Sequence, residues 1–333
     1  MAIRAMAAME QGGALAPWSY EPDALGPMDV RVRVKSCGIC FSDVHMIDND
    51  WGASRYPLVP GHEAVGVVEE LGGGVTHLKL GDRVGVGWQR GACLQCSDCL
   101  RGDENLCAEN RATIIHGRGG FAEALVIDSR FAFRLPEGLD TTTAGPLLCG
   151  GVTVYSALRH AGMRSGQNVG VIGVGGLGHL AVQFAAKLGN RVTVFTTSDD
   201  KAELASRLGA HEAVVTRAGE EPSCSRDLDV LISTVPVALD FAAYLDLLGS
   251  DATMTFVGVP NEPMSVPLVK LLARRRRITA SPIGGRAMMD EMLRTADTFG
   301  IAPIVETFPL AAAGDAIAKV RANAVRYRAV LTV

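Results

Sequence analysis

Four closely spaced cysteines are the residues of this sequence best suited to bind a metal. Cys93, Cys96, Cys99 and Cys107 follow the pattern C-x2-C-x2-C-x7-C. Four thiolates can complete a tetrahedral zinc site with no open position, and a site of this kind is structural. An iron–sulfur cluster also takes four cysteines, but the usual fourth spacing and the trailing proline are absent here. We therefore predict a structural zinc lobe at about residues 91–108, a segment with too few apolar side chains to fold by packing alone.

A glycine-rich turn predicts a dinucleotide-binding site in the second half of the chain. The turn matches the motif G-x-G-x-x-G. It follows an apolar segment at residues 168–172 and precedes a helical pattern that ends at Gly189, and this strand–turn–helix order is the context that the motif requires. The glycines allow a pyrophosphate to approach the backbone, and the helix N-terminus offers unpaired N–H groups. The motif G-x-G-x-x-G is formed here by Gly173, Gly175, Gly176, Leu177 and Gly178.

The residues after the next predicted strand indicate which dinucleotide binds. An acidic residue about 20 positions after the glycines would bind the adenosine ribose of NAD, whereas hydroxyl groups and a lysine suit the 2′-phosphate of NADP. The sequence has hydroxyls and a lysine there, which favours NADP(H) over NAD(H). Asp199 and Asp200 keep NAD(H) open, because a short shift of the loop would bring a carboxylate to the ribose. The residues predicted to contact the 2′-phosphate are Thr196, Thr197, Ser198 and Lys201.

Three scattered residues, Cys40, His62 and Cys149, are further candidate metal ligands. Taken singly, a cysteine or histidine is more often a packing residue than a ligand. Their settings change this interpretation, because Cys40 lies in C-G-I-C-F-S-D-V-H, His62 in G-H-E and Cys149 in G-P-L-L-C-G. The remaining cysteines, Cys37 and Cys224, lie outside both groups and are interpreted as small packing residues.

With these segments the chain resembles the zinc-dependent medium-chain alcohol dehydrogenases, and among them the cinnamyl alcohol dehydrogenase-like branch that reduces aldehydes with NADPH. The resemblance covers essentially the whole chain, from the segments above to the ending Arg326-Tyr327-Arg328. It implies an α/β protein with a GroES-like β-barrel catalytic domain and a doubly wound parallel-sheet (Rossmann) nucleotide-binding domain, with a cleft between them for cofactor and metal. It also implies a homodimer.

The resemblance assigns roles around a second, catalytic zinc ion. Cys40, His62 and Cys149 match its ligands and leave a fourth position for water or substrate oxygen, where the ion can polarise a carbonyl. Asp43 matches a carboxylate that orients His62. Glu63 matches a carboxylate near the metal, either with a catalytic role or as a buried structural partner.

The resemblance also implies a proton relay and a substrate channel. The Ser42 hydroxyl would bond the substrate oxygen, and His45, reached through the cofactor ribose, would exchange the proton with solvent. The nicotinamide would transfer the hydride. The tryptophans would line an apolar cleft for an aromatic or medium-length aldehyde, or would lie in the core or rim instead. The residues in segments that border the channel or pass near the nicotinamide are Trp51, Trp88, His116 and Ile283.

The elements that must position these residues change in character along the chain. Short apolar alternations broken by glycine predict strands in the first part, at 30–34, 64–69, 83–86 and 121–127. From about residue 150, strands alternate with helices, which predicts a parallel, doubly wound sheet. Its predicted strands are 168–172, 191–195, 213–215, 229–234, 252–257 and 278–280, its predicted helices are 177–188, 200–208 and 238–248, and a helix at 287–299 and a terminal strand at 329–333 follow.

Length and motif positions together predict two domains. A chain of 333 residues is long enough for two, since single cores rarely exceed ~250–300 residues. We expect residues 1–145 and 283–333 to form the catalytic domain with its zinc lobe, and residues 146–282 to form the NADP(H)-binding domain.

Composition and charge restrict the class of protein. The formal net charge of −4 gives no basic footprint for nucleic acid, and the run Arg274 to Arg277 is interpreted as a solvated helix end entering a strand. No stretch approaches the ~18 apolar residues of a membrane helix, and no secretory signal is evident. We therefore expect a cytoplasmic protein that binds neither nucleic acid nor membrane, and in that reducing compartment the clustered cysteines serve metal binding rather than disulfides.

Three functions remain compatible with these features. The leading one is a dehydrogenase with two zinc ions per chain that transfers a hydride between NADP(H) and a primary alcohol or aldehyde, mainly as an aldehyde reductase. Reduction of a conjugated carbon–carbon double bond, as in zinc-free relatives, is the second, and the intact ligand trio and Ser42 argue against it. The third is a non-catalytic nucleotide-binding or redox-sensing protein, which predicts one zinc per chain and no NADPH oxidation with any aldehyde.

Overall fold

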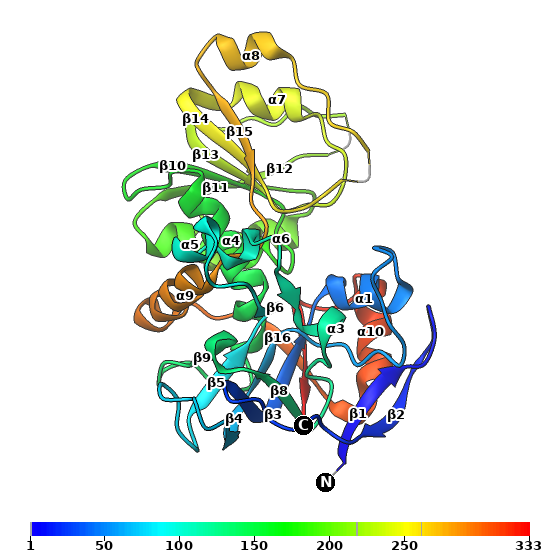
Figure 1. Cartoon of the computed structure of the whole chain (residues 1–333). Coiled ribbons are helices and arrows are strands. Elements are labelled where there is room, and N and C mark those ends of the chain that lie inside the picture. The colour runs from blue at the N-terminus through cyan, green and yellow to red at the C-terminus, as the bar shows by residue number, and fades with distance from the viewer. Residues whose placement is uncertain (1, 218, 261) are drawn as a thin grey trace. The chain divides into compact units, whose positions relative to one another are not determined.

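The computed structural model describes residues 2–217, 219–260 and 262–333, and the chain divides into two compact units (Figure 1). Unit 1 comprises Met1–Gly150 and Gly285–Val333, and unit 2 comprises Gly151–Gly284. Both ends of the chain therefore belong to unit 1, and unit 2 is one continuous segment between its two parts. Among the described residues, every helix is too short or too polar to cross a bilayer.

Unit 1 is built from antiparallel sheet. Its strands are β1 (Ile3–Ala8), β2 (Leu15–Tyr20), β3 (Asp29–Ile39), β4 (Ala64–Leu71), β5 (Arg83–Val86), β6 (Gln89–Gly91), β7 (Arg111–Ala112), β8 (Ala124–Asp128), β9 (Ala132–Arg134), β16 (Val305–Pro309) and β17 (Arg328–Thr332). Seven of them form one sheet ordered β16-β17-β3-β4-β5-β9, with β8 also paired to β3. Only the β16–β17 pair of this sheet is parallel. The terminal strand β17 thus joins the N-terminal strand β3 in the sheet that carries the candidate site.

Short helices occupy the connections of unit 1. The α-helices are α1 (Phe41–Asp48), α2 (Ser97–Leu100), α3 (Thr113–His116), α9 (Arg286–Phe299) and α10 (Ala313–Arg321). The 3-10 helices are η1 (Glu104–Leu106), η2 (Ser129–Phe131), η3 (Gly145–Leu148) and η4 (Leu310–Ala312). Two of them, α1 and η3, border the candidate metal ligands Cys40 and Cys149.

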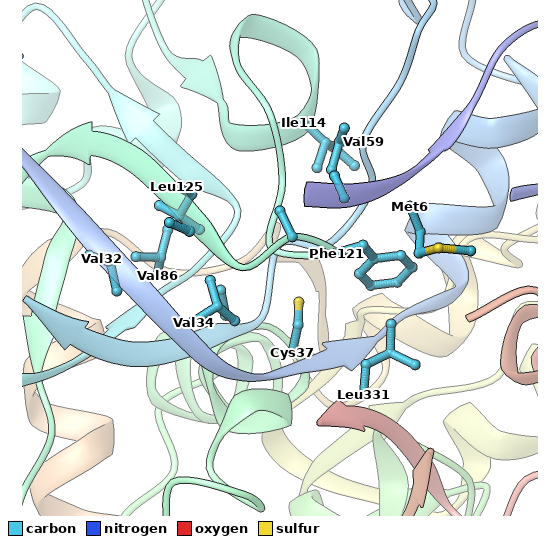
Figure 2. Close-up of a cluster of buried hydrophobic side chains, with 14 of the residues drawn as sticks. Met6, Val32, Val34, Cys37, Val59, Val86, Ile114, Phe121, Leu125 and Leu331 are labelled. Carbon is cyan, nitrogen blue, oxygen red and sulfur yellow. The ribbon is translucent and has the colours of Figure 1, made fainter. Parts of the chain in front are cut away.

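The core of unit 1 explains why β3 is a strand. Val30, Val32 and Val34 are buried and alternate with arginines, which is the period of a strand with one face in the core. Figure 2 shows the buried side chains around Phe121, which is fully buried. The predicted strand 121–127 therefore starts too early: β8 begins at Ala124, because Phe121 packs into this core instead.

Unit 2 is a doubly wound parallel sheet, as predicted. Its strands are β10 (Asn168–Ile172), β11 (Arg191–Thr196), β12 (Glu212–Val215), β13 (Leu228–Ser233), β14 (Leu248–Phe256) and β15 (Arg277–Ala280). They are ordered β12-β11-β10-β13-β14-β15 and all pairs are parallel. In sequence order this is 3-2-1-4-5-6, the arrangement that binds dinucleotides where the strand order reverses, between β10 and β13.

The helices of unit 2 agree less closely with the predictions. They are α4 (Gly150–His160, which starts on the last residue of unit 1), α5 (Gly178–Lys187), α6 (Asp199–Arg207), α7 (Phe241–Asp246) and α8 (Leu268–Leu272). Helix α7 is shorter than the predicted 238–248 because the Asp240 carboxylate accepts from the N–H groups of Ala242 and Ala243 and caps it. Helix α4 is missing from the predictions, since two glycines and β-branched residues at its start have poor helix propensity.

The interpretation of the arginine run as solvated is wrong for one of its members. Arg276 is buried: its Nε and Nη2 donate to the Leu248 carbonyl at 3.0 and 2.6 Å, and its Nη1 donates to the Lys270 carbonyl at 3.2 Å. The other three arginines are exposed. Arg276 thus satisfies carbonyl groups where the chain passes from α8 to β15, and these contacts explain why one arginine of the run is inside the protein.

Candidate active site

The three scattered candidate ligands come together in unit 1. Cys40 follows β3 and begins α1, His62 precedes β4, and Cys149 follows η3. His62 Nε2 lies 3.3 Å from Cys149 Sγ, which lies 3.8 Å from Cys40 Sγ. These atoms and a carboxylate oxygen of Glu63 all lie within 4.8 Å of one another. Two sulfurs and one imidazole nitrogen at such distances can share one zinc ion.

Asp43 holds the histidine of this group in place. The carboxylate is fully buried, and one oxygen lies 3.0 Å from His62 Nδ1 and accepts from the Gly61 N–H at 2.8 Å. The other accepts from the Cys40 N–H at 2.9 Å, as a capping box of α1. Asp43 thereby fixes the His62 ring with Nε2 directed at the sulfurs, which is the orientation a metal ligand requires.

The protonation of the two sulfurs also fits a metal. The Cys149 thiol donates to Cys40, which lowers the pKa of Cys40 and raises the pKa of Cys149. Cys40 is therefore the more acidic of the two thiols, and a cation bound between the sulfurs would hold both as thiolates. Metal binding at such a site releases the thiol proton.

Glu63 borders the same site and is paired with Arg328 of β17. Both side chains are buried, and a guanidinium nitrogen of Arg328 contacts one oxygen of Glu63 in a close ion pair. Burial raises the pKa of Glu63 to about 7, although Arg328 acts in the opposite direction. The other oxygen has no hydrogen-bond partner within the described residues, so it is available to a cation. A Cβ at Gly38 would lie 1.9 Å from that oxygen, which explains a glycine at this position.

Ser42 and His45, the predicted relay, both lie on α1. The Ser42 hydroxyl lies 3.7 Å from Cys40 Sγ, beside the ligand group. His45 is three positions further along the helix and lies near the same face. Its Nδ1 lies 2.6 Å from a carboxylate oxygen of the exposed residue Asp50. The other ring nitrogen, Nε2, takes no part in this contact. Sequence reasoning did not identify Asp50.

The predicted pocket residues are placed unevenly. Trp88 packs edge-to-face on the His62 ring at 5.0 Å, and Trp51 packs on Trp88 at 5.8 Å. The Nδ1 atom of His116 instead accepts a hydrogen bond from the Ala112 N–H at 3.1 Å, so this contact lies within the short helix α3 and its N-cap. Ile283 belongs to unit 2, in the connection after β15, and is half-buried. Trp88 is therefore the predicted pocket residue that the structure brings against a candidate metal ligand, and Trp51 reaches that ligand only through Trp88.

The four remaining ligands form a second group in unit 1. The Sγ atoms of Cys93, Cys96, Cys99 and Cys107 all lie within 4.8 Å of one another. The Cys96 N–H donates to Cys93 Sγ at 3.3 Å, and together with the Gln95 N–H it lowers the pKa of Cys93 to about 7. Four sulfurs at these distances can enclose a zinc ion completely.

The other two cysteines lie apart from both groups. Cys37 is fully buried in the core of unit 1 (Figure 2). Cys224 is partly exposed in unit 2, where its thiol donates to the Arg226 carbonyl. Neither thiol belongs to a ligand group.

The glycine turn connects β10 to α5 in unit 2. Gly173 has φ +90°, a conformation that favours glycine, and a Cβ at Gly178 would lie 1.9 Å from the Gly173 carbonyl oxygen. A Cβ at Gly175, in contrast, would meet no atom within 4 Å. The turn is thus closed at both ends and open in the middle. Gly176 lies in the same turn, and Leu177 is the N-cap of α5.

The predicted 2′-phosphate residues follow the neighbouring strand. Thr196 ends β11, Ser198 is the N-cap of α6, and Lys201 lies in its first turn, with Thr197 exposed between them. Asp199 also lies in that first turn. Hydroxyl groups, a lysine and a helix N-terminus thus lie together at the carboxyl end of β11.

Comparison with known proteins agrees with this architecture. Residues 26–137 match the alcohol dehydrogenase GroES-like domain, and residues 176–298 match the zinc-binding dehydrogenase family. The chain is 43% identical over 331 residues to an aldehyde reductase of Synechocystis sp., with 99% of this chain and 98% of that protein covered. The chain belongs to the zinc-dependent medium-chain alcohol dehydrogenases. The resemblance predicted from the motifs is thereby confirmed, together with the fold class.

Solved structures place this alcohol dehydrogenase in the cinnamyl alcohol dehydrogenase-like branch. It superposes with a TM-score of 0.92 on a cinnamyl alcohol dehydrogenase of Sorghum bicolor, at 38% identity, covering 100% of this chain and 98% of that one. A cinnamyl alcohol dehydrogenase of Helicobacter pylori complexed with NADP(H) gives 0.91 at 28% identity, covering 100% and 98%. This alcohol dehydrogenase is therefore an oxidoreductase with one structural and one catalytic zinc ion per chain.

Proposed function

We propose that this alcohol dehydrogenase transfers a hydride between NADP(H) and a primary alcohol or aldehyde, mainly as an aldehyde reductase. The single observation that carries the proposal is the group of Cys40, His62 and Cys149 with Ser42 beside it. The comparison proteins add an aldehyde reductase and a complex with NADP(H).

The residues of the chain have separable tasks in this mechanism. When bound, the zinc ion supplies Lewis acidity to the carbonyl oxygen and NADP(H) supplies the hydride. Cys40, His62 and Cys149 would hold the metal, and Asp43 orients the imidazole. The Ser42 hydroxyl, beside Cys40, would hydrogen-bond the substrate oxygen.

Proton exchange with solvent falls to His45. Its ring stands between Phe41 and Trp51, at 4.9 and 5.2 Å, and Asp50 binds Nδ1. A partly exposed imidazole with one nitrogen fixed can take up and release a proton at the other. Asp50 thus extends the predicted Ser42–His45 relay by one carboxylate.

We propose the substrate class from the aromatic side chains near His62. Trp88 packs on the candidate metal ligand His62, and Trp51 packs on Trp88, so two apolar rings extend outward from the metal site. We propose that they bind the apolar part of an aromatic or medium-length aldehyde. His116 and Ile283 remain proposed lining residues on the resemblance alone.

Cofactor choice is proposed from the end of β11. Thr196, Thr197, Ser198 and Lys201 would bind the 2′-phosphate of NADP, and the glycine turn would bind the pyrophosphate. We assign residues 146–282, apart from the metal ligand Cys149, to NADP(H) binding, and residues 1–145 with 283–333 to catalysis and the zinc lobe.

Assembly and location complete the proposal. We propose a homodimer in the cytoplasm. The support for self-association is an exposed apolar surface on unit 2, where Leu268, Val269 and Leu272 of α8 are 69%, 69% and 78% exposed.

One experiment with three readouts tests the function. The purified protein should contain two zinc ions per chain, oxidise NADPH in the presence of cinnamaldehyde, and release the allylic alcohol. Release of the saturated aldehyde would instead show double-bond reduction. One zinc per chain without NADPH oxidation across aliphatic and aromatic aldehydes would show a non-catalytic protein. NADH as the preferred donor would overturn the cofactor assignment.

A further inference from the structure

Thr234 lies directly after β13, beside the point where the strand order of unit 2 reverses. Its hydroxyl donates to the Ile172 carbonyl at 2.8 Å, and its own N–H donates to the same carbonyl at 3.1 Å. Ile172 is the last residue of β10, immediately before the glycine turn. Thr234 is buried, with 9% of its surface exposed. Its hydroxyl therefore binds the backbone of the chain where the turn begins.

The same hydroxyl lies against both ends of the turn. A Cβ at Gly173 or at Gly178 would lie 3.1 Å from Thr234 Oγ1. The Gly173 carbonyl oxygen lies 3.5 Å from it. The first and last glycines of the motif thus both lie against one threonine side chain.

The segment that carries Thr234 has close neighbours on two sides. Val235 presses on Gly173 as well, because a Cβ at Gly173 would lie 2.5 Å from Val235 Cγ1. On its other side, a Cβ at Gly258 would lie 2.4 Å from the Val235 carbonyl oxygen. The segment Thr234–Val235 is therefore enclosed between the glycine turn and the residues that follow β14, and its position is transmitted to the turn.

We propose that Thr234 is a positioning residue for dinucleotide binding, which rests on the proposed NADP(H)-dependent function. By holding the Ile172 carbonyl and packing on Gly173 and Gly178, its hydroxyl fixes the direction of the backbone N–H groups that meet the pyrophosphate. A pyrophosphate site made of backbone N–H groups binds well only when the backbone conformation directs those groups at the phosphate oxygens. Thr234 touches no cofactor atom in this role and acts through the turn.

The hydroxyl can be tested separately from the volume of the side chain. Thr234→Val removes the hydroxyl and keeps the shape, whereas Thr234→Ser keeps the hydroxyl and removes the methyl group. Thr193→Val is a matched control, since Thr193 is a buried threonine of β11 whose hydroxyl bonds the Glu212 side chain and not the turn. Where Thr234→Val does not fold, Thr234→Ala and Thr234→Ser give the same comparison, because they differ only in the hydroxyl.

The measurement is the dissociation constant of NADPH and of NADH, by calorimetry on the zinc-loaded enzyme and its variants. We expect Thr234→Val to weaken both cofactors by about tenfold and by the same factor, since both carry the pyrophosphate, and Thr234→Ser and Thr193→Val to stay within about twofold of the unsubstituted enzyme. At saturating NADPH, kcat of Thr234→Val should stay within about twofold, because the reacting groups are unchanged.

Two results would overturn the role of Thr234. Binding by Thr234→Val within about twofold of Thr193→Val would show that the hydroxyl does not position the turn. Weakening of NADPH alone would place the effect at the 2′-phosphate. Failure of the unsubstituted enzyme to bind either cofactor is a different outcome, since it would remove the proposed function itself.

Discussion

The Nδ1 atom of His45 lies 2.6 Å from a carboxylate oxygen of Asp50. The contact forms because α1 ends at Asp48 and its C-cap Asn49 is left-handed (φ 58°), which turns the chain so that the Asp50 N–H donates to the His45 carbonyl. A histidine held in this way keeps one ring nitrogen occupied and the other open, as a group that exchanges protons requires.

We expect Asp50→Asn to slow turnover without affecting metal binding. An amide orients the His45 ring less firmly, so kcat should fall about tenfold, less than the full general acid–base contribution of about a hundredfold or more. Steady-state kinetics and the zinc content of the variant give the measurement. Asp251→Asn is the control, since Asp251 is an exposed aspartate of unit 2 that pairs with Arg275. Equal kcat values for the two variants would remove Asp50 from the relay.

We expect Arg328→Met to destabilise the protein strongly. It leaves the Glu63 carboxylate buried without its partner, which typically costs about 3–5 kcal/mol in the free energy of unfolding. The double variant Glu63→Gln, Arg328→Met should recover part of this loss, because no buried charge remains. Urea unfolding of the three proteins tests both statements. A double variant no more stable than Arg328→Met would show that the unpaired carboxylate is not the cause of the loss.

The pH dependence of stability should include a contribution from Asp82. Burial acts to raise the pKa of this carboxyl group, but the Lys79 N–H and the Arg134 guanidinium outweigh it, so its pKa in the folded protein lies below the ordinary value. A depressed pKa stabilises the fold above the unfolded value of about 3.9, and this stabilisation is lost as the pH falls through the folded value.

Melting temperatures of Asp82→Asn across pH test this contribution. The variant should be less stable than the unsubstituted protein by about 1–3 kcal/mol at pH 7, and the difference should shrink as the pH falls below about 4. A difference that stays constant down to low pH would show that the carboxylate charge plays no part.

Self-association should depend on the exposed leucines of α8. Leu272→Glu puts a charge on the apolar surface of Leu268, Val269 and Leu272, so we expect a dimer to become a monomer. Leu80→Glu is a matched control, because Leu80 of unit 1 is also exposed, at 62%. Light scattering after size-exclusion chromatography reports the mass. A dimer that persists in Leu272→Glu would place the interface elsewhere.

The parts of the site that could be predicted from the sequence are those whose chemistry depends on residue type and spacing. Clustered thiols, G-H-E and the glycine turn are each typical of one kind of site, and the structure gathers Cys40, His62 and Cys149 as one group. The parallel sheet was also predictable, because its strands are apolar on both faces and alternate with helices. Strand β10 even has the predicted bounds.

What the sequence left out depends on contacts that only the fold creates. Arg328 meets Glu63 across 265 positions, a pairing set when β17 joins β3. Nothing in the sequence distinguishes Asp50 from other surface aspartates, and only the turn at the end of α1 brings it to His45. Thr234 resembles other threonines at strand ends, and only the pairing of β13 with β10 brings its hydroxyl to the Ile172 carbonyl. In each case the partner is chosen by sheet order or chain direction, which single-residue patterns do not encode.

All seven candidate zinc ligands lie between Cys40 and Cys149, in the first half of the chain, whereas Arg328 lies five residues before its end. A ribosome therefore adds every ligand to the chain before it adds Arg328. Glu63 and all of the ligands are thus present in the growing chain before the guanidinium that pairs with Glu63 in the folded protein.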